Sequence, residues 1–190
     1  LLTPDLFLPL AEKTGLIVPI GNWVINEACR QLREWHLQGH QSWSMAVNLS
    51  TLQFEQPSLV KTVLDCLALH QVPPEMLILE VTETTAMSNP DESVRVLTEL
   101  TDAGVKASID DFGTGYSSLL YLKRLPACEL KIDRAFVQEL SGESEDATIV
   151  SAIVALAKTL NLKVVAEGVE TEAQQAFLTE LGCNTLQGYL

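Results

Sequence analysis

Carboxylate, amide and ammonium side chains recur at or near the ends of short apolar runs in this sequence. They are Asn48, Glu80, Asp110, Asp111, Lys131, Glu167 and Gln187. Four carboxylates brought close together repel one another unless cations lie among them, and ligation by oxygen alone suits Mg²⁺, Mn²⁺ or Ca²⁺. The pattern therefore predicts a divalent metal site, provided that the fold brings these residues together.

The adjacent pair Asp110 and Asp111 bears on the number of ions. Neighbouring residues of a regular strand point to opposite faces. At a strand end the backbone turns, so the first carboxylate can bridge two ions while the second binds only one. A two-metal centre of this kind suits phosphoryl chemistry.

Each of these residues also has a simpler interpretation. A single carboxylate at a strand end is often a helix cap or a solvated loop charge, and Glu83, Asp133 and Glu170 could each cap a turn or a following helix. Lys131 could be only a counter-charge in an acidic core. The joint pattern over several strands is what favours a functional site.

Strands and helices alternate along most of the chain. The predicted strands are Trp43–Leu49, Met76–Val81, Lys106–Asp110, Glu129–Asp133, Lys163–Glu167 and Asn184–Tyr189. The helices between them are predicted at Ser58–His70, Asp91–Ala103, Ala147–Leu160 and Glu172–Leu181. Two more, Pro4–Lys13 and residues 19–36, come first, and helical spacing suggests that Trp23 and Trp35 lie in the core. This alternation predicts parallel βα units.

An open doubly wound sheet and a (β/α)8 barrel both fit such units. No glycine-rich phosphate loop follows any predicted strand, which weakens the nucleotide-binding open sheets. Each strand carries polar residues on its less apolar face, and an open sheet would bury several of them unpaired at about 1–3 kcal/mol each. In a barrel they point inward and meet at the top. We therefore predict an α/β fold of the TIM-barrel type with about six of eight strands present, preceded by two helices.

Composition bounds the function further. The 190 residues include 25 acidic and 12 basic side chains, a formal charge of −13, which disfavours nucleic-acid polymers and anionic membranes as partners. Hydrophobic residues make up 47 %, enough for one compact domain spanning 1–190. No apolar stretch reaches the roughly 18 residues of a membrane span. Four cysteines without metal-binding spacing indicate thiols in a reducing compartment, and residues 142–146 form an acidic loop.

The same residues carry a family resemblance. The matching segments are Asn48-Leu49-Ser50, Glu80-Val81-Thr82-Glu83, Asp110-Asp111-Phe112-Gly113-Thr114-Gly115, Lys131-Ile132-Asp133, Ala166-Glu167-Gly168-Val169-Glu170-Thr171 and Gln187-Gly188-Tyr189-Leu190. In this order they resemble the EAL-domain phosphodiesterases, which hydrolyse the bacterial second messenger cyclic di-GMP to the linear dinucleotide pGpG.

The resemblance implies a role for each residue. Asn48, Glu80 and Asp110 would ligate one metal, and Asp110, Asp111 and Glu167 the second. The ions would be Mg²⁺ or Mn²⁺, with Ca²⁺ inhibitory, and a bridging water would attack the phosphorus. Lys131, Glu167 and Gln187 would be catalytic: Lys131 hydrogen-bonds the water, Glu167 helps to remove its proton and Gln187 orients water or substrate. Glu83 would support the loop that begins at Asp110.

The resemblance also implies partners and a location. A homodimer would form through the region of the 110–118 loop, and the parent protein would carry neighbouring GGDEF or sensory domains. The substrate and the thiols indicate the cytoplasm, with a parent that could be anchored in a membrane elsewhere.

One family motif is missing. The Glu-Ala-Leu tripeptide, whose glutamate is a metal ligand, occurs nowhere in the sequence. The chain starts at Leu1 without methionine and ends in a strand-like run, so we expect a domain that is incomplete at its N-terminus and at its extreme C-terminus. We expect a competent parent enzyme and an impaired isolated chain. The alternative is a receptor that binds cyclic di-GMP without cleaving it.

Overall fold

The computed structural model describes residues 2–115, 118–140 and 144–190. They form two compact units, one of Leu1–Val81 with Arg95–Lys106 and one of Thr82–Val94 with Ala107–Leu190. Parts of two predicted loops, at 116–117 and 142–143, lie outside the described residues.

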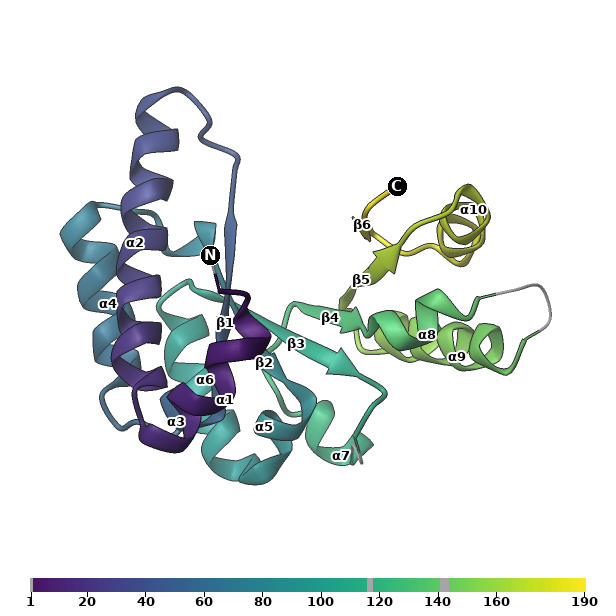
Figure 1. Cartoon of the computed structure of the whole chain (residues 1–190), viewed down its shortest axis with the longest axis horizontal. Coiled ribbons are helices and arrows are strands. Elements are labelled where there is room, and N and C mark those ends of the chain that lie inside the picture. The colour runs from purple at the N-terminus through teal and green to yellow at the C-terminus, as the bar shows by residue number, and fades with distance from the viewer. Residues whose placement is uncertain (1, 116–117, 141–143) are drawn as a thin grey trace. The chain divides into compact units, whose positions relative to one another are not determined.

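The first unit contains two parallel strands with helices beside them (Figure 1). Its elements are α1 (Pro4–Thr14), α2 (Ile17–Leu37), β1 (Met45–Leu49), α3 (Thr51–Phe54), α4 (Leu59–His70), the 3-10 turn η1 (Pro74–Met76) and β2 (Leu77–Thr82), with most of α6 (Pro90–Asp102). Buried leucine and valine side chains alternate along β2, as expected for a strand packed beneath helices.

Helix α2 is amphipathic, and the side chains along one stripe of it are buried in the core. Ile25, Cys29 and Leu32 follow one another at helical spacing and are fully buried. Trp23, which we predicted in the core, is 64 % exposed. It precedes Ile25 by two residues and so lies on the opposite side of the helix. The prediction for Trp23 was therefore wrong. Its spacing in the sequence is roughly helical, but it does not lie on the buried stripe of α2.

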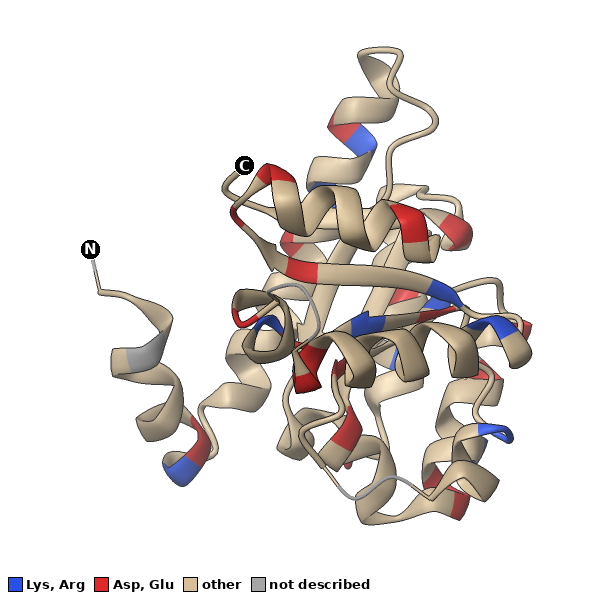
Figure 2. Ribbon diagram, turned by 90° about the vertical axis from the view of Figure 1, so that its right-hand side faces the viewer, with Lys and Arg blue, Asp and Glu red and all other residues tan. Residues whose placement is uncertain are grey.

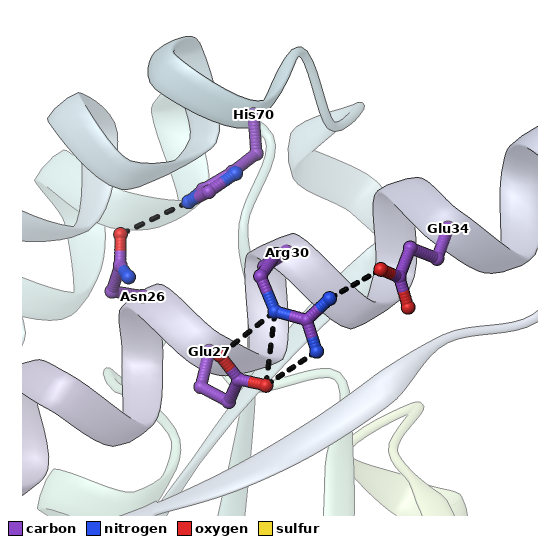
Figure 3. A network of polar contacts seen from close by, with 5 residues as sticks. All are labelled: Asn26, Glu27, Arg30, Glu34 and His70. Carbon is purple, nitrogen blue, oxygen red and sulfur yellow. Dashed lines mark hydrogen bonds and ion pairs between the residues drawn. The ribbon is translucent and has the colours of Figure 1, made fainter.

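Polar contacts line the edge of the packing between α2 and α4 (Figure 3). His70 Nε2 on α4 lies 3.0 Å from Asn26 Oδ1 on α2. Along α2, Arg30 Nε donates to Glu27 Oε2 at 2.9 Å, and its guanidinium also pairs with Glu34. These exposed ion pairs add little stability in water, so the apolar stripe is the main source of stability at this packing.

The second unit contains four parallel strands in chain order. They are β3 (Lys106–Phe112), β4 (Glu129–Ile132), β5 (Lys163–Val169) and β6 (Thr185–Gly188). The helices are α5 (Glu83–Ser88), α7 (Leu119–Leu122), α8 (Arg134–Gln138), α9 (Glu145–Thr159) and α10 (Glu172–Leu181). In this unit α8 and α9 pack against β5 (Figure 1).

The predicted strands and long helices are confirmed with ends that differ by at most two residues. The sequence analysis did not predict the short helices α3, α5, α7 and α8, since helices of four to six residues are too short to show a periodicity. Among the described residues, no helix combines the length and the apolar character that crossing a bilayer requires.

The buried stripe of α2 gives a test of the fold. Leu32→Ala should lower the free energy of unfolding by about 2–5 kcal/mol, because a fully buried leucine leaves a cavity. Leu37→Ala, on the same helix and 72 % exposed, should change it by less than about 0.5 kcal/mol. Urea unfolding followed by circular dichroism measures both, and equal losses would contradict the assigned stripe.

Candidate metal centre

Adjacent residues of a regular strand point to opposite faces, and a bulge in β3 changes this for Asp110 and Asp111. Pairing with β4 holds Ile109 opposite Leu130, shifts register, and resumes with Phe112 opposite Ile132. Asp111 has φ 53°, in the left-handed region that few residues other than glycine adopt. The extra residue bends the strand, and the Asp110 and Asp111 carboxylates reach the same cluster.

That cluster contains three carboxylates and one ammonium. Single oxygens of Asp110, Asp111 and Glu167 all lie within 4.8 Å of one another. Lys131 Nζ, on the strand between theirs, lies 3.2 Å from Asp110 Oδ1 and 2.7 Å from Glu167 Oε1. The Lys131 side chain is only 5 % exposed. The structure thus brings together four of the predicted site residues, with one positive charge facing three acidic groups.

The surroundings of Asp111 raise the pKa of its carboxyl. Burial, and after it the charge of Asp110, raises the pKa of Asp111 to about 6. A hydrogen bond with the Asp133 carboxyl and the charges of Asp133 and Glu167 act in the same direction. Asp110 is fixed differently, because its Oδ1 accepts the backbone N–H of Asp111 at 2.9 Å. The cluster therefore holds more negative charge than Lys131 alone compensates.

Asp133 is a member of this site that the sequence analysis treated as a cap. It does cap α8, since its Oδ1 accepts the N–H of Ala135 at 2.7 Å. Its carboxyl also hydrogen-bonds Asp111. The signal for this second role was present in the sequence, because Asp133 and Lys131 share one face of the same strand run.

Glu83 contacts the loop after Asp111. Its Oε2 accepts the backbone N–H of Gly113 at 2.8 Å, and the side chain is almost fully buried. Its other oxygen, Oε1, has no hydrogen-bond partner within the described ranges. A Cβ at Gly115 would lie 2.8 Å from that oxygen. A side chain at 115 would therefore require the Glu83 carboxylate to move.

The remaining predicted residues are placed by strand pairing. Gln187 on β6 lies opposite Glu167 on β5 and is exposed. In the first unit, Asn48 on β1 lies opposite Glu80 on β2, with Glu80 buried and Asn48 exposed. The two residues of each pair lie at the same level of neighbouring strands. The four residues of the cluster, Asp110, Asp111, Lys131 and Glu167, belong to the second unit.

The donor set of the cluster fits a hard divalent cation. It offers carboxylate oxygens close enough together to ligate one ion, and oxygen ligands are those that Mg²⁺, Mn²⁺ and Ca²⁺ prefer. Acidic residues outnumber basic ones by 25 to 12, and both kinds are coloured along the ribbon in Figure 2. A bound cation would relieve the repulsion that Lys131 leaves uncompensated.

The whole chain, residues 1–190, matches the EAL domain family, and the protein belongs to that family. It is 66 % identical over 190 residues to the bifunctional diguanylate cyclase/cyclic di-GMP phosphodiesterase MucR of Pseudomonas aeruginosa, covering 100 % of this chain and 28 % of MucR. It is 48 % identical over 190 residues to the cyclic di-GMP phosphodiesterase NbdA of the same organism, covering 100 % of this chain and 24 % of NbdA. The chain thus spans about a quarter of these relatives.

Solved structures support the same fold. The MucR phosphodiesterase in complex with c-di-GMP matches with a TM-score of 0.96 and 66 % identity, over 98 % of this chain and 76 % of that one. The EAL domain of Mycobacterium smegmatis DcpA matches with a TM-score of 0.83 and 39 % identity, over 88 % of this chain and 76 % of that one. The predicted TIM-barrel class of α/β fold is confirmed.

The Lys131 charge gives a first test of the site. In metal-free protein, Lys131→Met should lower the free energy of unfolding by about 3 kcal/mol or more, because it leaves buried carboxylates without their ammonium. Lys61→Met, in an exposed pair with Asp65, should have almost no effect. Chemical unfolding measures both variants, and a negligible loss for Lys131→Met would exclude a buried charged cluster.

The raised pKa of Asp111 predicts a pH dependence. Between its ordinary value of 3.8 and about 6, the folded state binds more protons than the unfolded state, so stability falls as the pH rises. Asp111→Asn should remove this penalty and gain about 1 kcal/mol near pH 7, after allowance for solvent screening. Thermal unfolding in chelator at about pH 5 and pH 7.5 tests it. A wild-type minus variant difference that does not change with pH would contradict the assignment.

Proposed function

We propose that the protein hydrolyses cyclic di-GMP to the linear dinucleotide pGpG in a reaction that depends on two divalent cations, Mg²⁺ or Mn²⁺. The observation that carries the proposal is the convergence of Asp110, Asp111 and Glu167 around Lys131. A buried ion pair alone would not require a third carboxylate, Asp111, whose pKa is raised by burial and by the charge of Asp110. The names of MucR and NbdA, both cyclic di-GMP phosphodiesterases, support the choice of substrate.

Bound cations would supply an acidified water and would neutralise the charge of a phosphodiester. The chain's own residues would do the rest. Asp110, Asp111 and Glu167 would hold the ions. The Lys131 ammonium would donate a hydrogen bond to the attacking water and stabilise the charge that develops on the phosphate oxygens. Glu167 would accept the proton of that water, and Gln187, opposite Glu167, would orient water or substrate.

Four further assignments belong to the same proposal and rest on the family resemblance. Asn48 and Glu80 would be metal ligands, and Ca²⁺ would inhibit by replacing the catalytic ions. Glu83 would support the 110–118 loop, in agreement with its hydrogen bond to Gly113. The protein would dimerise through the region of that loop.

A receptor that binds cyclic di-GMP without cleaving it is the competing function. Such a protein would not need the complete carboxylate set, so the presence of Asp110, Asp111 and Glu167 favours hydrolysis. The distinction is experimental, because binding and cleavage can be measured separately.

Binding is tested on the chain itself. Calorimetry with cyclic di-GMP should show metal-dependent binding in Ca²⁺, and chromatography should then follow pGpG in Mg²⁺. Cleavage is tested in a hybrid in which these 190 residues replace the matching segment of MucR, which is 66 % identical. A hybrid that binds but forms no pGpG would support the receptor, and one that neither binds nor cleaves would refute both functions.

A matched pair of glutamates tests the catalytic assignment in that hybrid. Glu167→Gln keeps the side-chain shape but removes the charge and the base, so kcat should fall by about 10²–10⁴-fold. Glu172→Gln, in the first turn of α10 and exposed, should leave kcat within about twofold. Steady-state pGpG production measures both. Equal rates for the two variants would remove Glu167 from the mechanism.

A further inference from the structure

Two glycines follow the metal-binding carboxylates, and both have left-handed backbones. Gly113 comes two residues after Asp111 and has φ 102°, while Gly168 comes directly after Glu167 and has φ 74°. Gly168 lies within a second bulge, where pairing of β5 with β6 shifts register between Glu167 and Val169. Asp111 and Glu167 are therefore each followed by a turn with positive φ, a conformation that glycine adopts without steric cost.

The first turn of α8 contacts both glycines. A Cβ at Gly168 would lie 2.7 Å from Arg134 Cβ, and one at Gly113 would lie 2.8 Å from Phe136 Cε2. Distances under 3 Å are too short for carbon atoms in van der Waals contact. Asp133, which caps this turn, also hydrogen-bonds Asp111. Residues Asp133–Phe136 thus touch the backbone or side chains on both sides of the cluster.

The β5 turn is closed on its other side as well. A Cβ at Gly188 would lie 1.9 Å from Val169 O, so β6 also leaves no space for a side chain. The backbone from Glu167 to Val169 is held between Arg134 and Gly188. Because bulges re-aim the side chains beside them, the backbone position here decides where the Glu167 carboxylate points.

We propose that the first turn of α8, Asp133–Phe136, is a positioning element that fixes the separation of Asp111 and Glu167. It acts through the contact of Arg134 Cβ with Gly168, the contact of the Phe136 ring with Gly113, and the Asp133 carboxyl. The inference rests on the proposed function, because it takes the carboxylate cluster as a metal centre. Arg134 contributes its Cβ, so the guanidinium is not part of the positioning contact.

The chain offers matched controls for the two glycines. Gly15 has φ 75° and Gly39 has φ 96°, and neither has any atom within 4 Å of an added Cβ. Gly15→Ala therefore carries the same backbone strain as Gly168→Ala without the contact, and Gly39→Ala does the same for Gly113→Ala. A difference within a pair isolates the contact with α8 from the left-handed conformation.

Two readouts separate this inference from the metal proposal. The first needs no metal: the NMR signal of the buried Lys131 ammonium, assigned with Lys131→Met, reports the distances to Asp110 and Glu167. The second is Mn²⁺ affinity by calorimetry. We expect Gly168→Ala and Gly113→Ala to shift or broaden the Lys131 signal and to weaken Mn²⁺ binding by at least about tenfold, with both controls like wild type. Wild type without Mn²⁺ affinity would overturn the metal proposal alone, and the Lys131 signal would still decide the positioning.

A variant that removes the Arg134 Cβ completes the test. Arg134→Gly deletes the Cβ that Gly168→Ala would strike, so the double variant should regain the Lys131 signal and most of the Mn²⁺ affinity. Arg134→Ala keeps the Cβ and should not rescue. If Gly168→Ala does not fold, as judged by circular dichroism, the double variant should fold and bind. A double variant that stays defective, or a Gly168→Ala protein that equals Gly15→Ala, would overturn the proposal.

Discussion

Repulsion among carboxylates gathered around one buried ammonium is the constraint on which the second unit depends. Lys131 pairs with Asp110 and Glu167, but the third carboxylate, Asp111, stays close to both and titrates at about 6. An apolar core of the same volume would avoid this cost. A positive charge from outside the chain would offset this cost. The most unfavourable feature of the electrostatics is thus also the feature that points to a cation site.

Irregular backbone geometry brings the carboxylates of the cluster together, which their residue types alone could not do. A regular strand would send Asp110 and Asp111 to opposite faces, and a regular β5 would continue its pairing with β6 through Glu167 without interruption. Both strands instead contain a register shift at a carboxylate of the cluster, with a left-handed residue at or beside it. Such conformations cost of order 1–3 kcal/mol when the residue is not glycine. Asp111 carries that strain, whereas Gly168 avoids it. The short helix α8 lies against both turns, so the packing of one element holds two distant segments of the sequence in place.

Much of the fold could be predicted because the signals are local. Runs of β-branched residues between helical periodicities gave six strands and six long helices with ends correct to two residues. Trp23 was misplaced, since roughly helical spacing did not reveal which stripe of α2 faces the strands. The carboxylates of the cluster could also be predicted, because their types and parity repeat from strand to strand. The bulges could not, since a register shift depends on how neighbouring strands pair. The role of Asp133 was missed for a related reason: its cap is local, but its hydrogen bond to Asp111 crosses between strands.

The position of Lys131 also bears on how tightly an ion could be held. Its ammonium lies 2.7 Å from Glu167 and 3.2 Å from Asp110, so a cation at these carboxylates must share them with a fixed positive charge. Sharing weakens the attraction for the ion, because like charges a few ångströms apart repel in a partly buried site. The same ammonium holds the Asp110 and Glu167 carboxylates in place when no ion is present, which lowers the cost of assembling the site on binding. Lys131 would therefore weaken the binding of an ion while holding the carboxylates ready for it. That balance suits an ion that must bind reversibly and polarise a water, and it suits less an ion held permanently for structure.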